Sequence, residues 1–91
     1  MMRVRWTTNA ANDLTHIVER IREDNPAAAQ KVAKRIYTAI AELRKSSNRG
    51  RIGLADNTRE LVFPPWPYAV YEIIEDQVHV LRIRHASQDW P

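Results

Sequence analysis

Hydrophobic and polar positions change their period several times along the 91-residue chain, and each period predicts an element. Residues 3–6 (RVRW) alternate between polar and apolar side chains, which is typical of a short strand. From Ala10 to Ile21 the apolar positions follow helical spacing, and the threonines before them offer N-cap oxygens. A second stripe with the same spacing runs from Ala29 to Leu43. The first half of the chain therefore predicts a strand followed by two amphipathic helices.

The predicted helices are separated only by the break Asp24-Asn25-Pro26. Asn25 is a suitable N-cap residue, and Pro26 suits the first helical position because its missing N–H needs no partner there. Because this connection is so short, we expect the two helices to form an antiparallel hairpin.

The second half of the chain predicts a sheet. A loop over 46–57 holds both glycines, Gly50 and Gly53. Three predicted strands follow the loop: 59–63 (RELVF), 68–74 (YAVYEII) and 78–84 (VHVLRIR). The middle one is apolar on both parities, as expected for a central strand that is covered on both faces. The sequence thus predicts an α+β fold: a short N-terminal strand, an antiparallel helix hairpin and a three-stranded antiparallel meander, with the helices on one sheet face.

The last predicted strand carries an unusual number of cationic groups. Strand alternation places four side chains on one face: Val78, Val80, Arg82 and Arg84. Leu81 and Ile83 on the other face are expected to pack beneath the helices, so that Arg82 and Arg84 point to the open face. His85 joins these arginines only if the strand ends or bulges there.

Composition and length narrow the class of protein. Residues 1–91 are expected to form one domain, and 44% hydrophobic with 27% charged residues is typical of a globular chain. The absence of cysteine excludes disulfides, a thiolate nucleophile and Cys-ligated zinc. No apolar leader precedes the first strand, and no run approaches the ~20 apolar residues of a membrane span. We therefore expect a cytoplasmic protein that makes no contact with a membrane.

The charge pattern permits an acidic partner without requiring one. The formal net charge is +3, and a segment without acids carries Arg44, Lys45, Arg49 and Arg51. Such a run is also typical of a solvated loop. The three histidines lack metal-ligand spacing, so neither a metal nor another cofactor is expected.

Several stretches together resemble the RelE/ParE superfamily of bacterial toxins. They are TTNAANDL after the opening strand, the helix hairpin, RELVF-PPWPYAVYEII and VHVLRIRHASQDW. The resemblance implies the toxin of a type II toxin–antitoxin module of the plasmid-stabilisation kind, wrapped and neutralised by a cognate antitoxin. RelE-like members cut mRNA in the ribosomal A site without a metal, whereas ParE-like members poison DNA gyrase. Because both kinds share the fold, the fold does not choose between them.

The resemblance also suggests site residues. RNA cleavage by a 2′-OH needs a base, cations that hold the phosphorane charge, and an acid for the leaving oxygen. The positions that correspond to catalytic basic groups of RelE-like toxins are Arg59, Arg82, Arg84 and His85. Cations expected to hold RNA phosphates are Lys45, Arg49 and Arg51.

Each of these residues also has a structural interpretation. Arg59 can pair with a carboxylate, His85 can serve as a structural hydrogen-bonding group, and the aromatic residues of 66–71 fit core or antitoxin contacts as well as base stacking. RelE-like enzymes are richer in lysine, and arginine hardly ever accepts a proton, so His85 or Glu60 would have to act as the base. A gyrase poison needs only a surface, and a degenerate homologue that only binds antitoxin is a third alternative. We favour the mRNA endonuclease, because packing alone does not explain an arginine-rich final strand.

Overall fold

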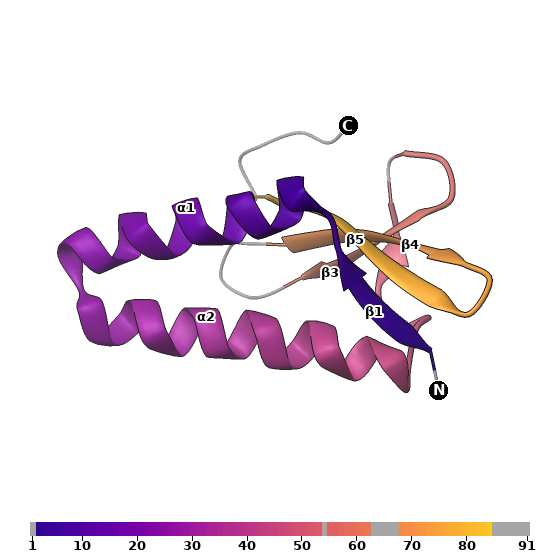
Figure 1. Ribbon diagram of the computed structural model, residues 1–91, viewed down its shortest axis with the longest axis horizontal. Coiled ribbons are helices and arrows are strands. Elements are labelled where there is room, and N and C mark those ends of the chain that lie inside the picture. Colours follow the sequence, from indigo (N-terminus) through magenta and orange to yellow (C-terminus); the bar gives the residue numbers. More distant parts are fainter. Residues whose placement is uncertain (1, 54, 63–67, 85–91) are drawn as a thin grey trace.

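A computed structural model describes residues 2–53, 55–62 and 68–84 (Figure 1). The chain begins with strand β1 (Arg3–Trp6), which leads into helices α1 (Thr8–Asp24) and α2 (Pro26–Ala41). A short 3₁₀ turn, η1 (Glu42–Arg44), extends α2. The remaining strands are β2 (Arg51–Ile52), β3 (Thr58–Val62), β4 (Tyr68–Ile74) and β5 (Gln77–Arg84).

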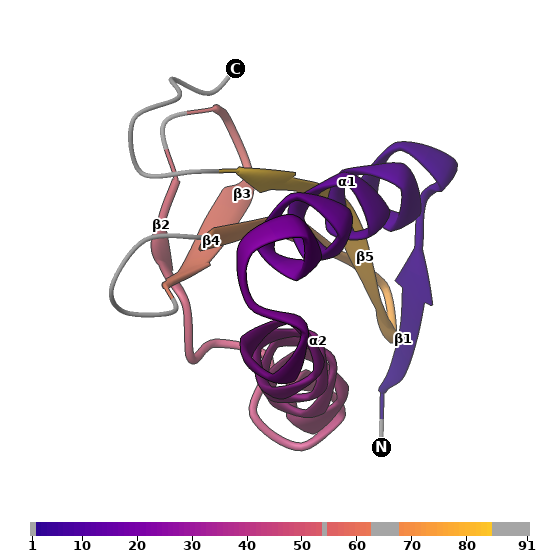
Figure 2. The ribbon, with the colours of Figure 1, turned by 90° about the vertical axis from the view of Figure 1, so that its left-hand side faces the viewer.

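The strands form one five-stranded sheet in the order β1-β5-β4-β3-β2. β1 runs parallel to β5, and every other neighbouring pair is antiparallel. The helix hairpin covers one face of this sheet (Figure 2), so the predicted α+β architecture is confirmed. The structure adds β2, which lies inside the segment 46–57 that was predicted as a loop throughout. A two-residue strand has too few positions to show a period in the sequence.

Both helices begin where their capping residues predicted. The Thr7 hydroxyl accepts a hydrogen bond from the Ala10 N–H at 3.1 Å. The Asn25 side-chain oxygen accepts one from the Ala28 N–H at 3.1 Å, and Pro26 is the first residue of α2. Each cap satisfies one of the N–H groups that have no partner within the helix.

The core lies between the hairpin and the sheet. Ile36, Ile40 and Leu43 pack with sheet residues that include Tyr71 and Val78, and all five have exposed fractions of 1% or less. In β4, the neighbours Ala69, Val70 and Tyr71 are all fully buried. A strand that is buried on both parities is a central strand, as the sequence predicted.

One prediction for β5 was wrong. Val78 and Val80 do not share the open face with Arg82, because both are fully buried in the same cluster as Ile83. The pairing of β4 with β5 passes from Tyr71↔Val80 to Val70↔Arg82, so Leu81 is an extra residue in a β-bulge. The bulge reverses the alternation, and Leu81 is only partly buried instead of packing beneath the helices. Arg82 and Arg84, which alternate with Ile83, lie on the face turned away from the core.

Candidate functional site

The side chain of Arg82 is held by the first helix. Its Nε donates to Asp13 Oδ2 at 2.7 Å, and its NH2 group donates to Asp13 Oδ1 at 3.0 Å. The same carboxylate accepts the backbone N–H of Ile83 at 3.0 Å. Burial alone raises the pKa of Asp13, but the hydrogen bonds from Arg82 and Ile83 and the charges of Arg82 and Arg84 outweigh burial and lower this pKa. Arg82 is therefore one half of a bidentate ion pair that joins α1 to β5.

The bulge next to this ion pair is held by Thr7, the N-cap residue of α1. The Thr7 N–H donates to the Val80 carbonyl at 3.1 Å, and the Thr7 hydroxyl donates to the Leu81 carbonyl at 3.0 Å. β1 pairs with β5 only as far as Trp6↔Val80. Beyond that point, the side chains of Thr7 and Asp13 form hydrogen bonds with the backbone of β5 where a neighbouring strand would otherwise do so. The sequence did not reveal this arrangement, because Thr7 and Asp13 lie about 70 residues away from their partners.

Arg59 lies on the other face of the sheet. It has the same parity as Leu61 and is paired with Tyr71, and both of these residues belong to the core cluster. Its NH1 group donates to the Gly50 carbonyl at 2.9 Å and to the Asn48 carbonyl at 3.4 Å. Arg59 therefore holds the backbone of the loop that follows η1.

Tyr71 holds the same loop from beneath. Its fully buried hydroxyl accepts the Gly50 N–H at 2.9 Å and donates to the Ser47 carbonyl at 2.7 Å. Burial raises the pKa of Tyr71, although the Gly50 hydrogen bond and the charge of Arg59 oppose the shift. A β-carbon at Gly50 would lie 2.8 Å from the tyrosine ring and 2.9 Å from the Glu60 carbonyl, so this position requires glycine for space. The sequence suggested core packing for Tyr71 but not its role in the loop.

The three predicted phosphate-binding cations, Lys45, Arg49 and Arg51, all lie exposed on this loop or at its end. Arg51 contacts the buried carboxylate of Glu60 through NH2 at 2.8 Å. Arg49 contacts Glu42 at 3.3 Å, and because both side chains are more than half exposed the pair adds at most about 1 kcal/mol. The loop thus presents a basic outer surface, and two of its arginines pair with carboxylates of the same chain.

Among the predicted catalytic residues that the structure describes, Arg59 is separated from the other two arginines. Arg82 and Arg84 share one face of β5, whereas Arg59 lies on the opposite, helix-covered face. His85 follows Arg84 and lies outside the described residues, as do Trp66 and Trp90. The row of β-sheet neighbours beside Arg82 is Val70 and then Glu60, which is paired with Arg51.

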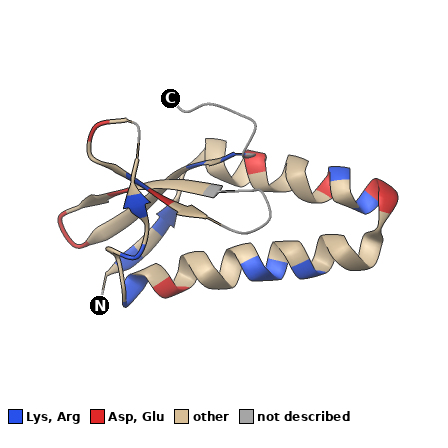
Figure 3. Ribbon diagram, turned by 180° about the vertical axis from the view of Figure 1, so that it is seen from behind, with Lys and Arg blue, Asp and Glu red and all other residues tan. Residues whose placement is uncertain are grey.

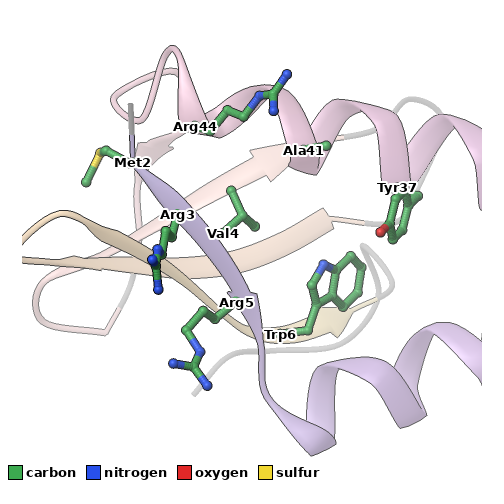
Figure 4. Close-up of a pocket in the computed structure, with 8 residues that line it drawn as sticks. All are labelled: Met2, Arg3, Val4, Arg5, Trp6, Tyr37, Ala41 and Arg44. Atoms are coloured by element: carbon green, nitrogen blue, oxygen red, sulfur yellow. The ribbon is translucent and has the colours of Figure 1, made fainter.

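A groove that the sequence did not predict lies between β1 and the end of α2. It measures about 650 Å³ and is lined by Met2, Arg3, Val4, Arg5, Trp6, Tyr37, Ala41 and Arg44 (Figure 4). The Trp6 and Tyr37 rings are stacked with centroids 6.1 Å apart, although Tyr37 is 63% exposed. The one signal in the sequence was Tyr37 itself, a large aromatic residue beside the apolar stripe of its helix rather than within it.

The described residues contain neither a metal site nor a membrane-spanning helix. Within them, no three of the histidine, aspartate and glutamate side chains are placed to hold a metal ion together. Neither of the two long helices has the length and hydropathy needed to cross a bilayer. Figure 3 shows that basic and acidic positions both occur on the helices and on the sheet, and that further acidic positions lie at turns.

The chain matches one family model and is similar to other proteins named as toxins. Residues 4–90 match the family described as "ParE toxin of type II toxin-antitoxin system, parDE". Toxin RelE2 of Caulobacter vibrioides is 43% identical over 97% of this chain and 99% of its own length. The Sinorhizobium fredii protein Y4kP is 40% identical over 98% of this chain and 93% of Y4kP. In the solved chromosomal ParDE system of P. aeruginosa, one chain superposes with a TM-score of 0.87 at 26% identity, covering 96% of this chain and 98% of that one.

Proposed function

The chain belongs to the ParE family of toxins of type II toxin–antitoxin systems, and from this membership we propose that it arrests growth by binding DNA gyrase, without an active site of its own. As a member of that family it is the toxin of a toxin–antitoxin module. The family does not by itself identify the target of the toxin. We infer gyrase as the target from the contacts of Arg59 and Arg82.

The observation that carries the proposal is the bidentate pair between Arg82 and Asp13. The carboxylate that accepts two hydrogen bonds from a guanidinium also balances its charge, so the pair offers little net positive charge to a phosphorane. Arg59 likewise donates to loop carbonyls on the far face of the sheet. These contacts give Arg59 and Arg82 structural roles, which weakens the argument for RNA chemistry from these two residues.

The binding surface that we propose for gyrase includes the outer side of the basic loop, with Lys45, Arg49 and Arg51. Tyr71 and Arg59 fix the backbone of this loop through four hydrogen bonds. The exposed side chains of the loop are therefore attached to a backbone with a defined conformation. A preorganised surface loses little conformational entropy on binding, which favours recognition of a large partner.

A second candidate function is ribosome-dependent cleavage of mRNA, with no metal and no other cofactor. It is favoured by the 43% identity to a protein named Toxin RelE2 and by the shared face of Arg82 and Arg84, directly before His85. In this alternative, His85 would transfer the proton and Arg84 would face the phosphate. Either target places the protein in the cytoplasm, and either implies a cognate antitoxin, as in the ParDE system that the fold matches.

The deciding experiment incubates the purified protein with gyrase, ATP and plasmid, and separately with a translation extract and a defined mRNA. We expect trapped double-strand DNA breaks and intact mRNA. Cleaved mRNA without DNA breaks would overturn the gyrase proposal in favour of the second candidate.

A matched pair of variants tests the role of Arg82 independently. If the ion pair is structural, Arg82→Met and Asp13→Leu both lower stability, Asp13→Leu somewhat more because it also removes the acceptor of the Ile83 N–H, and growth arrest falls only in proportion to stability. A chemical role for Arg82 predicts instead that Arg82→Met abolishes growth arrest, while the more destabilised Asp13→Leu variant remains toxic.

A further inference from the structure

We propose that the free edge of β1 and the adjacent groove bind an extended protein segment in which acidic residues alternate with large apolar residues. The inference deepens the antitoxin part of the proposed function, and it rests on that function only for naming the antitoxin as the natural source of the segment. The surface itself is defined by β1 and by Tyr37, Ala41 and Arg44 of α2 and η1.

The backbone of β1 offers the first part of the argument. β1 is the outermost strand on its side of the sheet, within the part of the chain that the structure describes. The N–H groups of Arg3 and Thr7 donate toward the β5 side, to Asp76 and Val80. Because alternate residues of a strand direct their backbone groups to opposite sides, those of Val4 and Trp6 point away from β5. A second chain can therefore pair with Val4 and Trp6 by strand addition.

The helix-side face of this edge is apolar. Figure 4 shows the side chains of Val4 and Trp6 pointing toward α2, where Tyr37 and Ala41 complete the groove. Tyr37 is 63% exposed although its ring stacks on that of Trp6. Aromatic surface of this kind gains contact area when a large apolar side chain covers it. An added strand would place every second side chain here.

The other face of the same edge is basic. Figure 4 shows the side chains of Arg3 and Arg5 pointing away from α2, on the opposite side of β1 from Val4 and Trp6, and both are exposed. Cross-strand neighbours share a face, so the remaining side chains of an added strand would lie beside these two guanidinium groups. Arginine pairs with carboxylates in a bidentate manner, which makes glutamate or aspartate the complementary residue. A third cation, Arg44, lines the end of the groove.

The two faces together specify the ligand. Apolar residues must alternate with acidic ones. This sequence pattern is the same for a parallel and an antiparallel added strand, since alternation is unchanged when a strand is reversed. A nucleic acid would satisfy the arginines and the aromatic rings, but it has no backbone amides at strand spacing for Val4 and Trp6. The edge therefore favours a peptide.

The test uses the full chain and a synthetic peptide with glutamate and leucine alternating over its central positions. A control peptide has the same composition with the glutamates and leucines in separate blocks. We expect the alternating peptide to bind at least about tenfold more tightly, and hydrogen exchange at the Val4 and Trp6 amides to slow on binding. Equal binding of the two peptides, or unchanged exchange at both amides, would overturn the inference.

A charge exchange sharpens the test. The double variant Arg3→Glu with Arg5→Glu should lose affinity for the alternating glutamate peptide by about tenfold or more, and it should gain affinity for the same peptide with lysine in place of glutamate. The matched control, Arg20→Glu with Arg22→Glu on the exposed side of α1, carries the same charge change and should bind as the parent does. Equal losses in the two variants would contradict a local site at β1. That result would not change whether the parent protein traps gyrase on DNA. The experiments can therefore reject the peptide site at β1 and the gyrase target independently of each other.

Discussion

Arginine has different roles at the two edges of the sheet, the β1 edge and the β2 edge. On the side of β2 to β4 and at the end of β5, Arg51, Arg59 and Arg82 donate to Glu60, to loop carbonyls and to Asp13. At β1, Arg3 and Arg5 are exposed and form no ion pair with any residue that the structure describes. A cation that pairs within the chain helps to fix the fold, even where its side chain stays partly exposed as in Arg51, whereas an exposed cation without such a partner is fully available to another molecule. Charge counted from the sequence does not separate these two roles.

The largest expected effect concerns Tyr71, which lies on the internally paired side. Tyr71→Ala removes a fully buried ring and both hydrogen bonds to the loop, and we expect the free energy of unfolding to fall by about 3–5 kcal/mol. Tyr71→Phe keeps the ring but leaves the Gly50 N–H unsatisfied, at a cost of about 1–3 kcal/mol. Urea denaturation measures both values. If Tyr71→Phe is as stable as the parent, the hydroxyl does not hold the loop.

The next effect concerns the Asp13–Arg82 pair and its dependence on pH. Asp13→Asn removes the charge that accepts from both Arg82 and Ile83, and we expect a loss of about 2 kcal/mol near neutral pH. The pKa of Asp13 is lower in the folded protein than its ordinary value of 3.8. Its stabilisation is therefore complete above 3.8 and is lost as the pH falls through the lower folded value.

Denaturation of the parent protein and Asp13→Asn across this range checks the sign. The difference in stability between the two should be largest near neutral pH and should shrink in acid, where Asp13 of the parent becomes protonated. A difference that stays constant from neutral to strongly acidic pH would mean that the carboxylate charge contributes nothing to the pair.

The sequence predicted most of the fold, because the fold follows from local patterns. Helical spacing, the caps at Thr7 and Asn25 and the alternating strands were each visible within a few residues. The bulge at Leu81 was not, since it depends on Thr7 and Asp13 meeting β5 across the whole chain. One inserted residue reverses the direction of the side chains that follow, so the burial of Val78 and Val80 was predicted wrongly.

The candidate site was harder to predict for the same physical reason. Residue type identified Arg59, Arg82 and Arg84 as cations, but the sheet face of each depends on register and on the bulge. The groove at β1 was missed because its parts are single residues from separate elements, such as Trp6 and Tyr37, that tertiary packing brings together.

The smallest effect on stability is expected at Tyr37, which lies on α2 in the groove beside β1. This residue tests most directly whether the β1 edge is a binding surface and not part of the core. Tyr37 and Ile36 are neighbours on α2, but Ile36 is 1% exposed in the core whereas Tyr37 is 63% exposed in the groove. Ile36→Ala should cost about 2–5 kcal/mol, while Tyr37→Ala should cost less than about 1 kcal/mol, because only the contact with Trp6 is lost. Binding of the alternating peptide should nevertheless weaken roughly tenfold in Tyr37→Ala, as titration of the peptide would measure. If Tyr37→Ala instead unfolds the protein as Ile36→Ala does, Tyr37 belongs to the core, and the contrast between an internally paired side and a binding edge is incorrect at this residue.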